Sequence, residues 1–100
     1  MGIVAFENSQ PCGFIALKSE HFLPNNPAFP WVGAAFVIPE KRNQGLGQYL
    51  FEQLELIIDK RQYPHIFCAT AVADNLLIRC GWQLSVPLSQ PSLRIYHKYI

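Results

Sequence analysis

Short apolar runs along the chain alternate with turn-forming segments, and one longer stretch repeats its apolar residues at helical spacing. Residues 3–6 and 13–17 are apolar runs separated by the turn-forming residues 8–11, which predicts an antiparallel hairpin. Residues 31–38 form a third apolar run and predict a buried strand. Residues 21–30 contain three prolines and two asparagines and therefore predict a loop between these strands.

A helical repeat follows the third apolar run and continues into a second set of elements. Its apolar residues are expected on one face of a helix: Leu46, Leu50, Leu54, Ile57 and Ile58. Residues 66–70 then predict a strand, residues 74–80 a short helix capped by Gly81, and residues 93–100 a last strand. The strand before the long helix and the strand after it form one β-α-β unit, which predicts a right-handed crossover between parallel strands.

The composition is that of a folded protein that does not bind nucleic acid. A chain of 100 residues can build one core, so residues 1–100 are expected to form a single domain. Half of the residues are hydrophobic, and the formal net charge of +1 leaves no basic face for a nucleic acid. No apolar run is long enough for a membrane span, and the N-terminus lacks the basic start and long apolar run of a signal peptide. The cytoplasm is therefore the expected location.

The cysteines do not predict a disulfide framework or a metal site. There are three of them, Cys12, Cys68 and Cys80, and no two are separated by the spacing of a zinc-ligand pair. Cys68 lies within an apolar run, where a thiol is more often a packing residue than a nucleophile. No metal is expected.

The segment that carries chemistry is the glycine-containing turn between residue 37 and residue 48. Such a turn at a helix start presents unpaired backbone N–H groups and the positive end of the helix dipole, which together suit a phosphate group. Gly45 and Gly47 permit close approach of a ligand to the main chain. The turn is not a P-loop, because Gln48 stands where that loop needs lysine, and it lacks the third glycine of a dinucleotide fingerprint.

The strand, the turn V-x-P-E-x-R-x-x-G-x-G and the helix resemble the acyl-CoA-binding motif of the GNAT superfamily of N-acyltransferases. The hairpin upstream, the pair Pro30-Trp31 and the closing pair Gly81-Trp82 are similar to other parts of that family, so the resemblance covers nearly the whole chain. It implies an α/β (α+β) fold with a mixed, mostly antiparallel central sheet, one long helix and one short helix. The family's usual first strand and two helices have no counterpart here, so the fold is expected to be N-terminally shortened.

The resemblance also implies a reaction and a set of binding residues. The reaction is transfer of an acetyl group from acetyl-CoA to a primary amine of a small molecule or protein, by direct attack in a ternary complex (an EC 2.3.1-type enzyme). Another short acyl-CoA is the alternative co-substrate. Residues of the third strand are expected along the pantetheine arm, and residues of the turn around the pyrophosphate. The expected acyl-CoA-binding residues are Ala35, Phe36, Val37, Arg42, Asn43, Gln44, Gly45, Leu46, Gly47 and Gln48.

The groups that would move protons are less well defined by the sequence. Glu20, His21 and Glu40 are candidate general bases, and a chain of waters is the alternative. Many family members carry a tyrosine acid at the position of Leu77, which has no proton to donate. Tyr63 and Tyr96 are possible substitutes.

The shortened N-terminus predicts an exposed sheet edge and exposed apolar surface. Proteins normally cover such surface, so we expect a homodimer or a second polypeptide that completes the fold. The aromatic residues Phe22, Phe29 and Trp31 are expected on the acceptor side, or else over the core. The alternative function is a catalytically weak or inactive acyl-CoA-binding or interaction module on the same fold.

Overall fold

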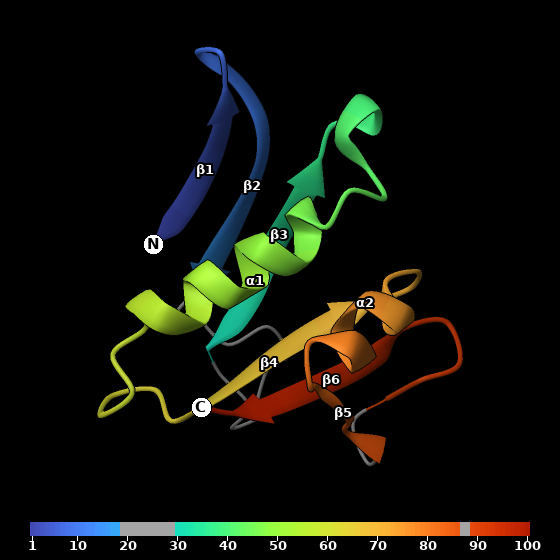
Figure 1. The fold of residues 1–100 in the computed structure, drawn as a ribbon. Coiled ribbons are helices and arrows are strands. Elements are labelled where there is room, and N and C mark those ends of the chain that lie inside the picture. Colours follow the sequence, from blue (N-terminus) through green and yellow to red (C-terminus); the bar gives the residue numbers. More distant parts are fainter. Residues whose placement is uncertain (19–29, 87–88) are drawn as a thin grey trace.

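A computed structural model describes residues 1–18, 30–86 and 89–100 of the chain (Figure 1). These residues form a mixed α/β fold with one six-stranded, mostly antiparallel sheet. The elements in chain order are β1 (Gly2–Glu7), β2 (Gln10–Lys18), β3 (Trp31–Val37), the 3-10 helix η1 (Pro39–Lys41), α1 (Leu46–Ile57), β4 (His65–Thr70), α2 (Asp74–Arg79), β5 (Gln83–Leu84) and β6 (Arg94–Tyr99). No helix among these described residues is both long and apolar enough to cross a membrane.

The strands lie in the order β1-β2-β3-β4-β6-β5. Among the described strands only β3 and β4 pair in parallel, as expected for a β-α-β unit. The first hairpin is closed by Asn8 and Ser9, which both have positive φ angles (51° and 66°) between the paired residues Glu7 and Gln10. Two left-handed residues in a two-residue loop match the right-handed twist of the strands, which explains why this turn closes a hairpin.

Both helices lie on the same face of the sheet (Figure 1) and cover the larger part of the core. Ile15, Leu54, Ile66 and Leu77 are fully buried there, from four different elements. The helical face was predicted only in part, because Ile57 is half exposed and Phe51 is buried in its place. Phe51 packs edge-on against Trp82, with ring centroids 5.8 Å apart. The core stripe of α1 is therefore turned toward the C-terminal half of the sheet.

The other face of the sheet carries a smaller apolar cluster. Trp31 is buried against Phe67, with ring centroids 5.5 Å apart, and Ile95 completes the cluster. Next to it, His65 Nε2 lies 2.7 Å from His97 Nδ1, and burial followed by the nearby His97 lowers the pKa of His65. Trp31 is thus a core residue of β3, whereas Phe22 and Phe29 lie outside the described residues.

The end of α2 has the geometry that its glycine predicts. Gly81 has a φ of +88°, its N–H donates to Ile78 O (3.0 Å), and Trp82 N–H donates to Leu77 O (2.9 Å). This pair of bonds is a Schellman motif, and the buried side chains of Leu77 and Trp82 supply its usual apolar contact. The chain then forms β5, a two-residue strand that the sequence did not predict. Its pairing with His97 and Tyr96 of β6 is long-range and leaves no local pattern.

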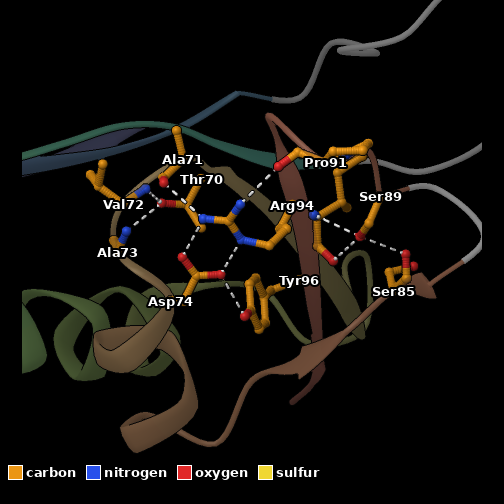
Figure 2. A network of polar contacts seen from close by, with 11 residues as sticks. Thr70, Ala71, Val72, Ala73, Asp74, Ser85, Ser89, Pro91, Arg94 and Tyr96 are labelled. Atoms are coloured by element: carbon orange, nitrogen blue, oxygen red, sulfur yellow. Dashed lines mark hydrogen bonds and ion pairs between the residues drawn. The ribbon is translucent and has the colours of Figure 1, made fainter.

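A polar network fixes the start of α2 to strand β6 (Figure 2). Arg94 donates from Nε to Asp74 Oδ2 (2.6 Å) and from Nη2 to Asp74 Oδ1 (2.7 Å), and Tyr96 donates its hydroxyl to Asp74 Oδ2 (2.8 Å). The same guanidinium donates to the carbonyl of Ala71 (2.7 Å), in the loop that enters α2. Hydrogen bonds from Arg94, followed by that from Tyr96, hold the pKa of Asp74 well below its usual range. A bidentate pair of this kind sets both position and orientation.

We predict that this network makes the fold sensitive to acid in a defined pH range. A carboxyl whose pKa is lowered by folding stabilises the protein above its unfolded pKa, roughly pH 4, and that stabilisation is lost as the pH falls further. Asp74→Asn should therefore lower the melting temperature at pH 7, and the difference from the wild type should shrink at pH 3. Thermal unfolding followed by circular dichroism at both pH values measures this.

Asp59→Asn is the matched control, because Asp59 accepts a bond from the backbone N–H of Arg61 (3.0 Å) rather than from a guanidinium. An Asp74→Asn effect that is equally large at pH 3 and pH 7 would contradict the proposed role of the ionised carboxylate.

Candidate functional site

The site is created by the divergence of two parallel strands. Strands β3 and β4 are paired only at Trp31 with Phe67 and at Val32 with Cys68, although both strands continue beyond these residues. Figure 1 shows them opening into a V, with α1 and α2 on the near side. Because strand pairing stops there, the backbone groups of β3 on this side have no β4 partner from Gly33 onward.

Different neighbours hold the two strands apart. Every residue of β4 is paired with β6, while β3 follows β2 through a register shift in which Leu17 faces Val32 and Ala16 faces Ala34. Gly33 is the additional residue at this bulge, and a glycine inside a strand commonly marks such a distortion. The sheet therefore consists of two firmly paired halves that separate at the β3–β4 seam.

A cleft of about 800 Å³ occupies the opening between the strands. Its walls are the free side of β3, the turn before α1, the end of β4 and the start of α2. The lining residues are Val32, Gly33, Ala34, Ala35, Phe36, Val37, Lys41, Arg42, Asn43, Gly45, Gly47, Gln48, Leu50, Phe51, Cys68, Ala69, Thr70, Val72, Ala73, Leu76, Leu77 and Arg79.

The turn at the mouth of the cleft presents backbone donors. Asn43 and Gly45 have positive φ angles of 62° and 84°, and a side chain at Gly45 would extend into open space. The first backbone hydrogen bond of α1 runs from Tyr49 N–H to Gly45 O (3.0 Å). The N–H groups that precede Tyr49 in the first turn therefore have no acceptor within the helix. No side chain caps this end and no acidic residue lies in the first turn. The positive end of the helix dipole is thus left for a ligand.

Arg42 shapes the turn as well as contributing charge. Its Nε donates to the carbonyl of Val37 (2.9 Å), and its guanidinium carbon lies 5.5 Å from the centre of the Phe36 ring. These contacts hold the cation at the end of β3 and leave its terminal nitrogens available. Gln44 ties the turn to η1 by donating from Nε2 to Glu40 O (3.0 Å).

The charges around the cleft favour an anion. The described lining includes Lys41, Arg42 and Arg79 but no aspartate or glutamate. Lys41 is paired with Glu7, and this hydrogen bond is the main reason that its pKa is raised. The two arginines therefore supply most of the positive charge, one from each side of the opening.

The structure brings most of the predicted binding residues together. Those that line the cleft are Ala35, Phe36, Val37, Arg42, Asn43, Gly45, Gly47 and Gln48. Gln44 and Leu46 instead line a second cleft, between α1 and β1. Sequence reasoning did not identify Thr70, Ala73 or Arg79, which reach the cleft from the second half of the sheet and carry no motif of their own.

Of the three candidate bases, only Glu40 lies among the described residues. Glu40 is exposed on η1, outside the residues that line the opening. Glu20 and His21 lie outside the described residues. The assignment of a general base to any of the three stays a prediction.

No tyrosine replaces Leu77 among the described lining residues. Leu77 is fully buried at the back of the cleft, and the hydroxyl of Tyr96 is directed to Asp74 instead. Tyr63, whose hydroxyl accepts a bond from Gln62 Nε2 (3.1 Å), is not part of the lining either. Cys68 does line the cleft, but burial raises the pKa of its thiol to about 12.

Comparison with known proteins shows the family to which the chain is similar. The profile of the acetyltransferase (GNAT) family matches residues 1–81. Among solved structures, a candidate streptothricin acetyltransferase from Bacillus anthracis str. Ames, in complex with acetyl coenzyme A, superimposes with a TM-score of 0.75 at 20% identity. That match covers 97% of this chain and 60% of the other. No curated protein matches the chain in sequence.

Two further solved structures have the same fold. The acetyltransferase from Agrobacterium tumefaciens str. C58 gives a TM-score of 0.71 at 14% identity, covering 95% of this chain and 57% of that one. A candidate acetyltransferase from Staphylococcus aureus Mu50 gives 0.68 at 21% identity, covering 98% and 70%. The chain thus spans less than two thirds of the length of the first two neighbours. With the family profile matching most of its residues and its fold shared with these enzymes, the chain belongs to the GNAT family of acetyltransferases.

Proposed function

We propose that the chain binds acetyl-CoA in the β3–β4 cleft and transfers the acetyl group to a primary amine. The observation that carries the proposal is the composition of this cleft: uncapped backbone donors and two arginines, with no carboxylate in the described lining. An anionic ligand with a long, partly apolar arm fits such a site. The acetyl coenzyme A bound to the Bacillus neighbour is consistent with this ligand.

The phosphates are assigned to the mouth of the cleft. Backbone N–H groups of residues 44–48 would donate to the pyrophosphate, with Asn43 at its edge. Arg42 and Arg79 face the same opening and would neutralise phosphate charge. This arrangement needs no metal ion, because the donors and cations belong to the chain.

The acyl arm is assigned to the free side of β3. The backbone groups of Ala35 and the N–H of Val37 face away from β2 and have no β4 partner, so they are available to hydrogen-bond the pantetheine amides, whereas Phe36 pairs with Phe14 of β2. A main-chain N–H on the same strand would donate a hydrogen bond to the oxyanion that forms when the thioester carbon becomes tetrahedral. The arm would then end at the apex of the V, where Val32 and Cys68 pair.

The chemical step is a direct displacement. The nitrogen lone pair of the amine attacks the thioester carbon, the C–S bond breaks, and coenzyme A leaves as a thiolate. The proton of the resulting ammonium passes to Glu20, His21, Glu40 or water. The thiolate of coenzyme A takes up a proton from solvent. Coenzyme A is a moderately acidic thiol, so its departure is feasible without an acid at Leu77.

We further propose that another chain completes the acceptor side, either a second copy or a complementing polypeptide, and that the protein acts in the cytoplasm. Exposed apolar residues on β1 support this assembly, with Val4 52% and Phe6 63% exposed. A catalytically weak or inactive acyl-CoA-binding module is the second candidate function. The leucine at position 77 is the observation that favours it.

We predict that a negative charge at Gly45 weakens acyl-CoA binding. Because a side chain there enters open space beside the uncapped helix start, Gly45→Asp would place a carboxylate where the phosphate is proposed to lie. Gly45→Asn is the matched control, since asparagine tolerates the same left-handed backbone without the charge. Calorimetric titration with acetyl-CoA should show a dissociation constant roughly 100-fold higher for Asp than for Asn. Equal affinities of the two variants would show that the phosphate lies elsewhere.

We predict turnover without a covalent enzyme intermediate. At neutral pH the Cys68 thiol stays protonated, because burial raises its pKa to about 12. Cys68→Ala should therefore keep its rate of thiol release with acetyl-CoA and a panel of primary amines, whereas loss of a true nucleophile would cost roughly 1,000-fold or more. Mass spectrometry should find no acetylated protein.

Two other results would change the assignment. An acetyl group on Cys68 together with loss of turnover in Cys68→Ala would contradict direct transfer. Tight acetyl-CoA binding without thiol release for any amine would favour the binding module.

A further inference from the structure

Strand β1 forms one edge of the sheet, and within residues 1–18, 30–86 and 89–100 no strand pairs with its outer side. The strand reads Gly-Ile-Val-Ala-Phe before its terminal Glu7, so it lacks the lysine or proline that commonly protects an edge. Glu7 is itself paired with Lys41. The edge is therefore uncharged along nearly its whole length.

The pairing of β1 with β2 shows which backbone groups face outward. Leu17 N–H donates to Met1 O (2.8 Å), and the Met1 amino group donates to Leu17 O (3.4 Å). Hydrogen-bonded pairs alternate along an antiparallel ladder, so Gly2 and Val4 direct their N–H and C=O groups away from β2. Beyond the bulge, Phe6 is opposite Pro11, which has no N–H to donate.

The outward-facing backbone groups of Gly2, Val4 and Phe6 can pair with the same groups of a second copy of the chain. We propose that β1 pairs antiparallel with β1 of a second copy of the chain, with Val4 opposite the partner's Val4. In this register Gly2 lies opposite the partner's Phe6, so the smallest residue of the strand is next to the largest. Every outward N–H and C=O of Gly2, Val4 and Phe6 then meets a complementary group. The proposal refines the assembly suggested above and is independent of acyl transfer.

The helix side of the sheet contributes a second strip of contact. A cleft of about 830 Å³ lies between β1 and α1, and Tyr49, Gln53 and Ile57 line it at four-residue spacing along the helix. Tyr49 is 53% exposed and Ile57 is 50% exposed. The two-fold axis that relates the paired strands would bring Tyr49, Gln53 and Ile57 close to the same residues of the partner. The exposed Ile57 side chain would then pack in the interface.

The available surface is sufficient for a modest interface. From the exposed fractions, Val4, Phe6, Tyr49 and Ile57 offer roughly 400 Å² in each protomer, since side chains of this size expose roughly 150–250 Å² when free. Two protomers would thus bury at most roughly 800 Å² of side-chain surface, and the strand backbone adds to this, which is the size of a weak or transient interface. Among the described residues that line the β1–α1 cleft, the charged ones are Glu7 and Lys41, and these two neutralise each other.

A charge exchange at Val4 tests the register. Because Val4 would face itself across the two-fold axis, Val4→Lys and Val4→Glu should each raise the dimer dissociation constant roughly 100-fold. An equimolar mixture of the two variants should form heterodimers, which also demonstrates that both variants are folded. Sedimentation equilibrium of the full chain, from about 1 μM to about 1 mM, measures these states. Val86→Lys is the matched control, because Val86 is exposed (69%) and follows β5, the strand at the opposite edge of the sheet, and it should dimerise like the wild type.

Three outcomes would overturn the proposal. A wild-type chain that stays monomeric at the highest concentration excludes a second copy as the occupant of the edge. A dimer that survives Val4→Lys uses another surface. Variants that do not recover association when mixed would show that Val4 does not face Val4. None of these results alters the acetyl-CoA titration, so failure here is distinguishable from failure of the proposed activity.

Discussion

The separation of β3 from β4 is the constraint on which the rest of this structure depends. After two paired residues each strand remains bonded only to its other neighbour, β3 to β2 and β4 to β6. A sheet that opens in this way loses ladder hydrogen bonds, which is tolerable only where water or a ligand satisfies the free groups. The helices compensate for the lost pairing, because α1 contacts β1, β2 and β3 and packs against α2. The cleft and the core are thus two consequences of one break in the sheet.

The second half of the cleft is held by the Asp74–Arg94 pair in addition to the hydrophobic packing of Leu77. Thr70 Oγ1 accepts the N–H groups of Val72 (3.1 Å) and Ala73 (2.7 Å), which turns the chain from β4 into α2. Arg94 lies opposite Thr70 on β6 and binds both Asp74 and the carbonyl of Ala71 (Figure 2). The N–H groups of Val72 and Ala73, the Ala71 carbonyl and the Asp74 carboxylate therefore each have a defined partner. The same pairing neutralises the carboxylate beside the cleft, which keeps the opening favourable for an anion.

Local signals in the sequence predicted the local features of the fold. The hairpin at Asn8 and Ser9, the glycine cap at Gly81 and the parallel unit around α1 follow from short-range patterns, and the structure has all of them. The exchange of Phe51 for Ile57 in the core was not predictable in this way, because α1 turns toward Trp82 of the other half-sheet. Arg79 is a similar case. Its place in the cleft depends on the distance between strands, which no motif encodes.

The position of Leu77 separates ligand binding from proton transfer in this chain. Its side chain is fully buried and belongs to the core cluster that contains Trp82. A hydroxyl at this place would need a polar partner inside an apolar contact, so the leucine favours stability over acid catalysis. The remaining titratable groups of the described lining are cationic or, like Cys68, protonated at neutral pH. In the proposed reaction, the proton of the attacking amine would therefore leave through water or through residues outside this lining.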